Sequence, residues 1–416
     1  MSSHALFERY ERRFSLAKAR LPVRKPWTAA GRDEIRRLVR SCLGIRDEWT
    51  PSFTTEKTGE ARCDAFTVEL LRAESWPGCR GAAHLYVPDA PAAQPPPLVM
   101  VFCGHGEGGK LHGAYQRMAR AIARRGAAAL VHDNIGQGER APMGHSDCVA
   151  PFACGTSVQG LIVMEALGWL EWARLSGRFD ASRVAAVGNS GGGTQALCLA
   201  ALSDDLAAIS SSGYPSTFDF VARKEKRHCH CNILPGVAGR LEMWHCLGAF
   251  APRPMLVFQG ECDPLFPVDL FHTCARKVGE CYGRSGAGEA RRAEAFRAEV
   301  VAGGHSWDAA RRELLGGWLT AVLGLHEHAG PDEETETLLT NDGRCWSEWP
   351  CGALTTDDVA RSVTGVDAPA GLKLWDVYPP ELPEGVPPDA LDGETPRGTV
   401  RQIASQFEAF LGEPAR

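Results

Sequence analysis

Ser190 stands in a stretch that is typical of an activated nucleophile. Residues 184–187 form a short apolar run, the Gly-rich turn 188–193 follows, and a helix-compatible segment comes next. Glycines two positions before and after the serine, Gly188 and Gly192, leave room for a sharp, strained strand-to-helix corner. We therefore predict a G-x-S-x-G nucleophile elbow. The alternative, a phosphate-binding Gly-rich loop, would need a lysine that this stretch lacks.

A serine hydroxyl is a weak nucleophile unless a histidine takes its proton and an acid holds that histidine in one tautomer. Behind an elbow of this type, the acid and then the histidine follow the serine along the chain. His305 comes directly after the last apolar strand and before the last helix, and we predict it as the base. Asp263, which follows another apolar strand, is the predicted acid, although Asp-Pro also starts helices. Glu261 and Asp269 are the alternative acids.

Acyl transfer also needs backbone amides that face the developing oxyanion. The first predicted donor is the amide of Gly191, directly after the serine and at a helix N-terminus. The second should come from the loop 103–110, which follows an apolar strand and matches the HGxG type, with Cys103 where the histidine usually stands. We predict the His105 amide as this donor, with Glu107 as the alternative.

Candidate substrate contacts come from two irregular segments. The stretch 213–250 lies between two predicted strands and is placed to form a pocket wall, so we predict contacts from Tyr214, His230 and Trp244. Arg140 follows the polar turn after the strand near residue 130 and could orient a polar substrate. Each of these side chains could equally serve packing.

The run His228-Cys229-His230-Cys231 contains imidazole and thiol groups, which are zinc ligands. Adjacent residues of an extended segment point to opposite sides, and no second paired cluster follows at zinc-finger spacing. We therefore predict no metal and no cofactor.

The elements that must position these groups form a regular series. Apolar strands alternate with helices from residue 98 to residue 323, as in a parallel sheet covered on both faces. Two alternating strands, near 66–70 and 83–87, come before this series. Two amphipathic helices, 4–20 and 31–44, open the chain. The sequence predicts an α/β fold with a mostly parallel central sheet.

We divide the chain into an N-terminal helical extension (1–60), a catalytic domain (61–328) and an acidic C-terminal extension (329–416). The last part has no clear period, but its tryptophans argue that it packs on the body or on a partner subunit. Residues 1–40 hold 11 basic and 4 acidic residues, whereas residues 331–416 hold 6 and 17. Such ends could dock within one subunit or in a homodimer, or stay separately solvated.

Bulk properties exclude several classes of protein. The net charge of −6 and the lack of a basic stripe argue against a nucleic-acid partner. No apolar run of about 18 residues and no secretory signal is visible, so we expect no membrane association. The 15 cysteines are odd in number and scattered, which favours reduced thiols in the cytoplasm.

At these residues the sequence resembles the acetylxylan-esterase-like and prolyl-oligopeptidase-like branch of the α/β hydrolases. The resemblance covers roughly residues 60–325 and rests on six segments: 104–110, 133–138, 188–194, 230–236, 251–254 and 304–305. It implies the α/β-hydrolase fold and ester hydrolysis, often the removal of small acyl groups. Cys103 departs from the usual histidine, and no export signal is visible, which argues against a secreted polysaccharide as the substrate.

The sequence thus predicts a serine carboxylesterase that hydrolyses a short acyl ester, such as an acetyl ester, of a small molecule or a carbohydrate. The same triad could instead pass the acyl group to an alcohol or amine, in an acyltransferase or a tailoring enzyme of a small-molecule pathway. A prolyl-oligopeptidase-like peptidase and a non-catalytic binding protein are further alternatives.

Overall fold

A mixed sheet of nine strands runs through the protein in the order β1-β2-β3-β5-β4-β6-β7-β8-β9. The computed structural model describes residues 3–89, 94–106, 108–223, 229–286, 295–327, 336–395 and 398–412. The first four strands in this order, β1, β2, β3 and β5, pair antiparallel. From β5 onward to β9, neighbouring strands pair parallel. The strands are β1 (Thr54–Cys63), β2 (Phe66–Glu74), β3 (Arg80–Pro88), β4 (Leu98–Phe102), β5 (Ala128–His132), β6 (Val184–Asn189), β7 (Ala208–Ser212), β8 (Met255–Gly260) and β9 (Phe296–Val301), with a small separate pair β10 (Glu394–Thr395) and β11 (Gly398–Thr399).

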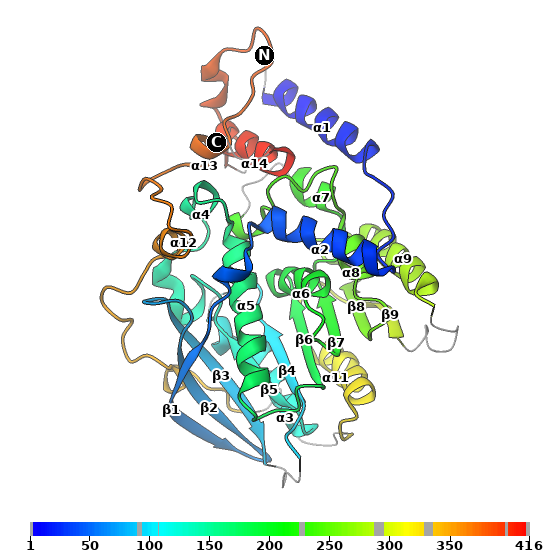
Figure 1. Cartoon of the computed structure of the whole chain (residues 1–416), viewed down its shortest axis with the longest axis vertical. Helices are drawn as coiled ribbons and strands as arrows, with labels where there is room; N and C mark the ends of the chain where they lie inside the picture. The colour runs from blue at the N-terminus through cyan, green and yellow to red at the C-terminus, as the bar shows by residue number, and fades with distance from the viewer. Residues whose placement is uncertain are drawn as a thin grey trace.

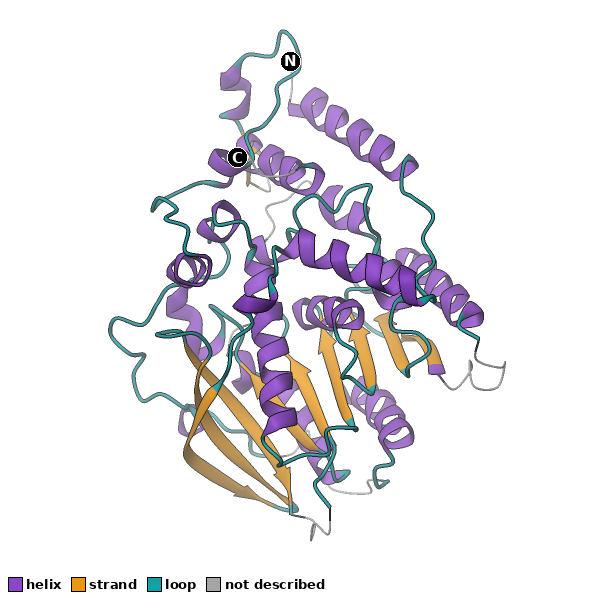
Figure 2. Cartoon of the chain, viewed as in Figure 1, coloured by secondary structure: helices purple, strands orange, loops and turns teal. Residues whose placement is uncertain are grey.

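Helices lie on both sides of this sheet (Figure 2). They are α1 (Ser3–Ala19), α2 (Ala29–Leu43), α3 (Gly113–Arg124), α4 (Ala150–Ala153), α5 (Val158–Leu175), α6 (Gly191–Leu202), α7 (Phe218–Arg223), α8 (Met243–Gly248), α9 (Val268–Arg284), α11 (Ala309–Leu323), α12 (Thr356–Thr364), α13 (Leu374–Val377) and α14 (Val400–Leu411). Among the helices of the described residues, none is long and apolar enough to cross a membrane.

The central strands are buried on both faces because each face has its own core. In β4, Met100 and Phe102 belong to the core that α5 and α6 cover, whereas Val99 and Val101 belong to the core that α3 and α11 cover. Side chains of a strand alternate between the two faces, so a strand with two cores must be apolar at every position. The predicted fold class, a mostly parallel sheet with helices on both faces, is confirmed.

Strand β1 is not predicted from the sequence. Its ten residues are polar or half-exposed along their whole length, so neither face shows the alternation that identifies a strand. It pairs with β2 through backbone hydrogen bonds, with one register shift between Lys57 and Gly59. The sheet therefore begins inside the segment predicted as a helical extension.

The two ends of the chain dock on each other at one end of the molecule (Figure 1). The ring of Tyr10 in α1 stacks on Phe407 in α14 at 4.9 Å, and its hydroxyl donates to Glu408 at 2.8 Å. Arg13 forms an ion pair with Glu408, and Arg9 pairs with Glu381 at 3.5 Å. The opposite charges of the two ends are thus paired within one subunit, and the homodimer stays a prediction.

The C-terminal extension begins as a strap along the body. Glu336 accepts a hydrogen bond from Arg120 of α3 at 2.9 Å and also pairs with Arg124. Further on, the Cys345 carbonyl accepts from Arg72 of β2 at 2.8 Å. The segment from Glu336 to Cys345 is therefore fixed to α3 and β2 at both of its ends.

Candidate active site

The turn between β6 and α6 has the strained geometry of a nucleophile elbow. Ser190 adopts φ 57° and ψ −121°, a left-handed backbone conformation that is costly for a residue with a side chain. A Cβ atom at Gly188 would lie 2.1 Å from the Gly192 carbonyl oxygen, and one at Gly192 would lie 2.1 Å from the Phe102 carbonyl oxygen. Both glycines are therefore required, because the turn closes on itself at Gly188 and packs against β4 at Gly192.

His305 and Asp263 form a hydrogen-bonded pair in the loops after β9 and β8. The Nδ1 atom of His305 lies 2.7 Å from Asp263 Oδ2, which also accepts from Gln259 Nε2 at 2.7 Å. The other oxygen, Oδ1, accepts from the amides of Leu265 and Phe266 at 2.8 and 3.0 Å. Burial alone would raise the pKa of Asp263, but the hydrogen bonds from His305 and the two amides outweigh it and lower that pKa.

Asp263 also closes a turn ahead of α9, through the amides of Leu265 and Phe266. One carboxylate oxygen closes the loop ahead of α9, whose N-cap is Pro267, and the other remains for the imidazole. Asp263 is therefore not the N-cap of α9, and its role as the catalytic acid stays a prediction.

Gly213, directly after β7, lies against the imidazole of His305. A Cβ atom at this position would lie 2.9 Å from His305 Cε1. The preceding residue, Ser212, accepts the Ser190 amide through its carbonyl at 2.9 Å. Its hydroxyl accepts from Trp307 Nε1, also at 2.9 Å. The carboxyl end of β7 thus joins the serine turn to the loop that carries the histidine.

The loop after β4 also lies against the elbow. A Cβ atom at Gly104 would lie 2.9 Å from Ser190 Cβ, and one at Gly191 would lie 3.1 Å from His105 Nδ1. The Gly104 amide donates to the hydroxyl of Tyr115 at 2.6 Å, which fixes the loop on α3. The structure therefore brings the predicted oxyanion loop to the serine. The alternative donor, Glu107, lies outside the described residues.

A buried ion network ties this loop to the next one. The Lys110 ammonium lies 2.9 Å from Asp133 Oδ2 and also pairs with Glu139. Asp133 accepts the Lys110 amide at 2.7 Å as well. Glu139 in turn accepts the amides of Cys345 and Trp346 from the C-terminal extension, both at 2.9 Å. Asp133 thus joins the loop after β5 to the loop after β4.

The predicted substrate contacts lie in different places. Arg140 is buried and forms two hydrogen bonds with Glu165, at 2.7 and 2.9 Å, so its guanidinium is committed to that carboxylate. Tyr214 is also buried, and its ring packs on Phe266, which in turn stacks on His305. Tyr214 therefore supports the imidazole from behind.

Trp244 and His230 lie on other elements. Trp244 in α8 stacks on His245 at 3.7 Å and lies under Lys277 of α9, away from the residues of the elbow. His230 is buried, with Nδ1 2.9 Å from the Cys148 carbonyl oxygen. His230 also borders a hollow of about 200 Å³ with Trp375, Lys373 and two glutamines of the C-terminal extension, Gln402 and Gln406.

We expect Arg140→Gln to lower stability strongly and to leave the KM of the folded enzyme unchanged. The substitution leaves the Glu165 carboxylate buried without its partner, which costs about 3–5 kcal/mol. Thermal unfolding with activity assays on the folded fraction measures both effects. The matched control is Arg178→Gln, which removes a more exposed pair with Glu69 and should change stability by less than about 1 kcal/mol. A raised KM at unchanged stability would instead place Arg140 at the substrate.

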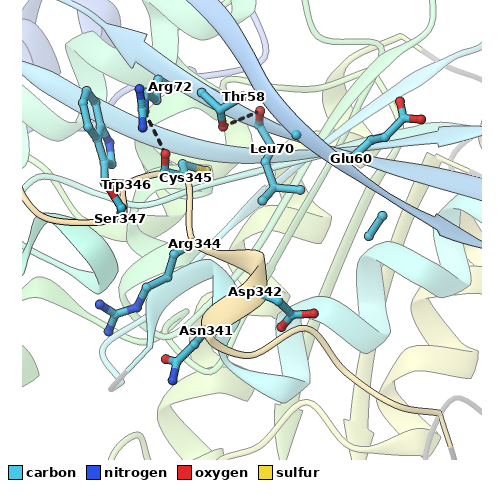
Figure 3. Close-up of a pocket in the computed structure, with 12 residues that line it drawn as sticks. Thr58, Glu60, Leu70, Arg72, Asn341, Asp342, Arg344, Cys345, Trp346 and Ser347 are labelled. Carbon is cyan, nitrogen blue, oxygen red and sulfur yellow. Dashed lines mark hydrogen bonds between the residues drawn. The ribbon is translucent and has the colours of Figure 1, made fainter.

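The volume of a hollow alone does not identify the active site. A hollow of about 860 Å³ lies between β1, β2 and the segment 341–347, where Arg72 donates to the Cys345 carbonyl and Thr58 donates to the Leu70 carbonyl (Figure 3). Three strands, β3, β5 and β4, stand between β2 and the elbow strand β6. This hollow therefore contributes nothing to the groups around Ser190.

One group of side chains beside the elbow has the composition of a metal site. His105, His145, Cys229 and Cys231 each offer one ligand atom, and these atoms all lie within 4.8 Å of one another. His228, the first residue of the motif seen in the sequence, lies outside the described residues. Sequence spacing could not reveal this group, because its histidines come from two loops far from the cysteines along the chain.

The fold is that of several solved carbohydrate esterases. The methylesterase BT1017 is 20% identical over 85% of this chain and 78% of its own, with a TM-score of 0.65. A glucuronoyl esterase from Solibacter usitatus is 16% identical over 71% of this chain and 93% of its own, with a TM-score of 0.58. A protein described as a putative acetyl xylan esterase from Bacteroides fragilis is 16% identical over 65% and 74%, with a TM-score of 0.54.

No protein-family model and no curated protein matches the sequence. Identities of this size show a shared fold. The strand order, the elbow at the end of β6 and the likeness to these structures lead to one conclusion: this chain has the α/β-hydrolase fold.

Proposed function

We propose that the protein is a serine esterase that uses Ser190, His305 and Asp263. The observation that carries this proposal is the elbow: Ser190 is held in a strained conformation at the end of β6, and Gly213 joins it to the His305–Asp263 pair. A serine at such a corner is exposed to substrate and sits at a helix N-terminus, which favours the negative charge of the reaction.

In the proposed reaction, Ser190 attacks the ester carbonyl while His305 takes the hydroxyl proton. The Asp263 carboxylate keeps the proton of His305 on Nδ1, so that Nε2 is the basic atom, and it stabilises the imidazolium. The amides of Gly191 and His105 hold the oxyanion. His305 then protonates the leaving alcohol, and water, activated by the same imidazole, releases the acid from the acyl-enzyme.

We propose a carbohydrate ester as the substrate. Support comes from the names of the similar structures, which include a methylesterase, a glucuronoyl esterase and a putative acetyl xylan esterase. The hollow beside His230 is lined by a tryptophan, a lysine and two glutamines of the C-terminal extension. A tryptophan and two glutamines that line one hollow suit a sugar ring and its hydroxyls.

We also propose a reducing compartment, the cytoplasm, for the working enzyme. All fifteen cysteines are free, and eleven of them are buried. A reducing environment keeps such thiols unpaired.

The proposal is tested with a panel of esters that separates two kinds of carbohydrate ester. Acetylated xylo-oligosaccharides release acetate, whereas methyl esters of uronic acids release methanol. We expect turnover of at least one of the two kinds, measured by product release, with Ser190→Ala as the blank. If the folded enzyme turned over no ester of either kind above that blank, the carbohydrate assignment would be wrong.

A further inference from the structure

Four side chains from three loops converge beside the elbow. His105 lies in the loop after β4, His145 in the loop after β5, and Cys229 and Cys231 in the segment after β7. The His105 Nε2 atom lies 3.1 Å from Cys231 Sγ and 3.2 Å from His145 Nε2. The two sulfur atoms lie 3.2 Å apart. From this arrangement we infer that His105, His145, Cys229 and Cys231 bind a zinc ion.

The distances fit a tetrahedral site. Zinc binds imidazole nitrogen at roughly 2.0–2.1 Å and thiolate sulfur at about 2.3 Å, which places neighbouring ligand atoms about 3.3–3.8 Å apart. The three contacts, 3.1–3.2 Å, are shorter than this, most of all between the two sulfur atoms, and the whole set falls within 4.8 Å. A small outward movement of the ligand atoms would admit the ion.

A hydrogen bond behind His145 supports its role as a ligand. Its Nδ1 atom lies 2.8 Å from the Ile135 carbonyl oxygen, so the proton resides on Nδ1 and the Nε2 lone pair faces the other three groups. Metal-binding histidines commonly have such a partner on the other ring nitrogen, because it fixes the tautomer and the orientation of the ring. The Gln137 amide, 3.3 Å from the same Nε2 atom, would have to turn away when the ion binds.

The donor set selects the metal. Two thiolates and two imidazoles in a tetrahedral arrangement suit zinc, whereas carboxylates and carbonyls, which suit magnesium and calcium, are not among the four ligands. Four protein ligands make a closed coordination shell, which is typical of a structural ion rather than of one that binds substrate. His105 is exposed, so the ion can reach the site from solvent.

The zinc ion would act as a clamp on the loops around Ser190. Its ligands join the loop that carries the proposed oxyanion donor to two other segments, and the ring of His105 lies against Gly191. Binding would hold these loops in the arrangement described above. The zinc site stands independently of the proposed esterase activity, because it rests on side-chain geometry alone.

Cobalt substitution tests the site without any assay of activity. The full-length protein, purified under reducing conditions and stripped with a chelator, is titrated with Co²⁺. We expect the intense visible absorption of tetrahedral cobalt and a thiolate-to-cobalt charge-transfer band, which saturate at about one equivalent and disappear on addition of Zn²⁺. Absorption typical of octahedral cobalt, or no thiolate band, would overturn the assignment.

Variants show which residues hold the ion. Cys231→Ser and His145→Asn should lose the metal bound to the wild-type protein, measured by elemental analysis, whereas the control Cys262→Ser, an exposed cysteine elsewhere, should keep it. Equal metal content in Cys231→Ser and the wild type would refute the site. So would intact-mass evidence of a Cys229–Cys231 disulfide in the protein as isolated, before any reductant or chelator is added.

Discussion

Asp263→Asn should reduce kcat/KM by roughly 10⁴-fold while the protein stays folded. The asparagine side chain can still accept from the amides of Leu265 and Phe266 through its oxygen, so the loop ahead of α9 is kept. Its amide group, however, donates toward His305 where the carboxylate accepted. The imidazole then places its proton on Nε2, the atom that must take the serine proton, and the base is lost.

The two alternative acids are the matched controls. Glu261→Gln and Asp269→Asn remove carboxylates that lie within six residues of Asp263 along the chain, whereas the Nδ1 atom of His305 contacts Asp263. Both variants should keep kcat/KM close to that of the wild type, measured with the best ester of the panel, and all three should have similar melting temperatures. A loss in Asp269→Asn that equals the loss in Asp263→Asn would move the acid to α9.

Gly192→Ala should disrupt the elbow and the enzyme together. A Cβ atom at this position meets the Phe102 carbonyl oxygen at 2.1 Å and the carbonyl carbon at 2.7 Å, and both are backbone atoms of the central strand β4. No side-chain rotation can relieve such a contact, so α6 must move away from the sheet. We expect a loss of about 3 kcal/mol or more in stability, at the upper end for overpacked sites.

Gly317→Ala separates this contact from the general effect of a helical glycine. Gly317 lies in α11, and a Cβ atom there meets nothing within 4 Å. Because alanine favours a helix over glycine by up to about 1 kcal/mol, this variant should be as stable as the wild type or more so. Chemical unfolding and ester turnover are measured on both. If Gly192→Ala were as stable and as active as Gly317→Ala, the packing of the elbow described here would be wrong.

Much of the fold could be predicted because its signals are local. Apolar strands alternate with helices from β4, which begins at Leu98, to α11, which ends at Leu323, as the local pattern predicts. The elbow was readable for the same reason, since its glycines lie within two residues of Ser190. Chain order together with the ends of strands selected His305 and Asp263, and the structure joins the two side chains by a hydrogen bond; their catalytic roles stay a prediction.

The remaining features depend on contacts between distant residues. Tyr115 supports the oxyanion loop from a helix, and nothing in an amphipathic pattern distinguishes it from a core tyrosine. The prediction that no metal binds has the same limit. It relied on the spacing of histidines and cysteines along the chain, whereas His105 and His145 approach the cysteines only through the fold. Arg140 is paired with Glu165 of α5, and nothing in the sequence around Arg140 indicates this partner.

The most direct test of the account is covalent labelling of the serine. The protein is treated with a fluorophosphonate, and the adduct is located by tandem mass spectrometry. We expect a single adduct on Ser190, with labelling greatly slowed in Asp263→Asn and absent from Ser190→Ala. A folded enzyme that turns over its ester but stays unlabelled at Ser190, or carries the adduct on another residue, would contradict the proposed nucleophile.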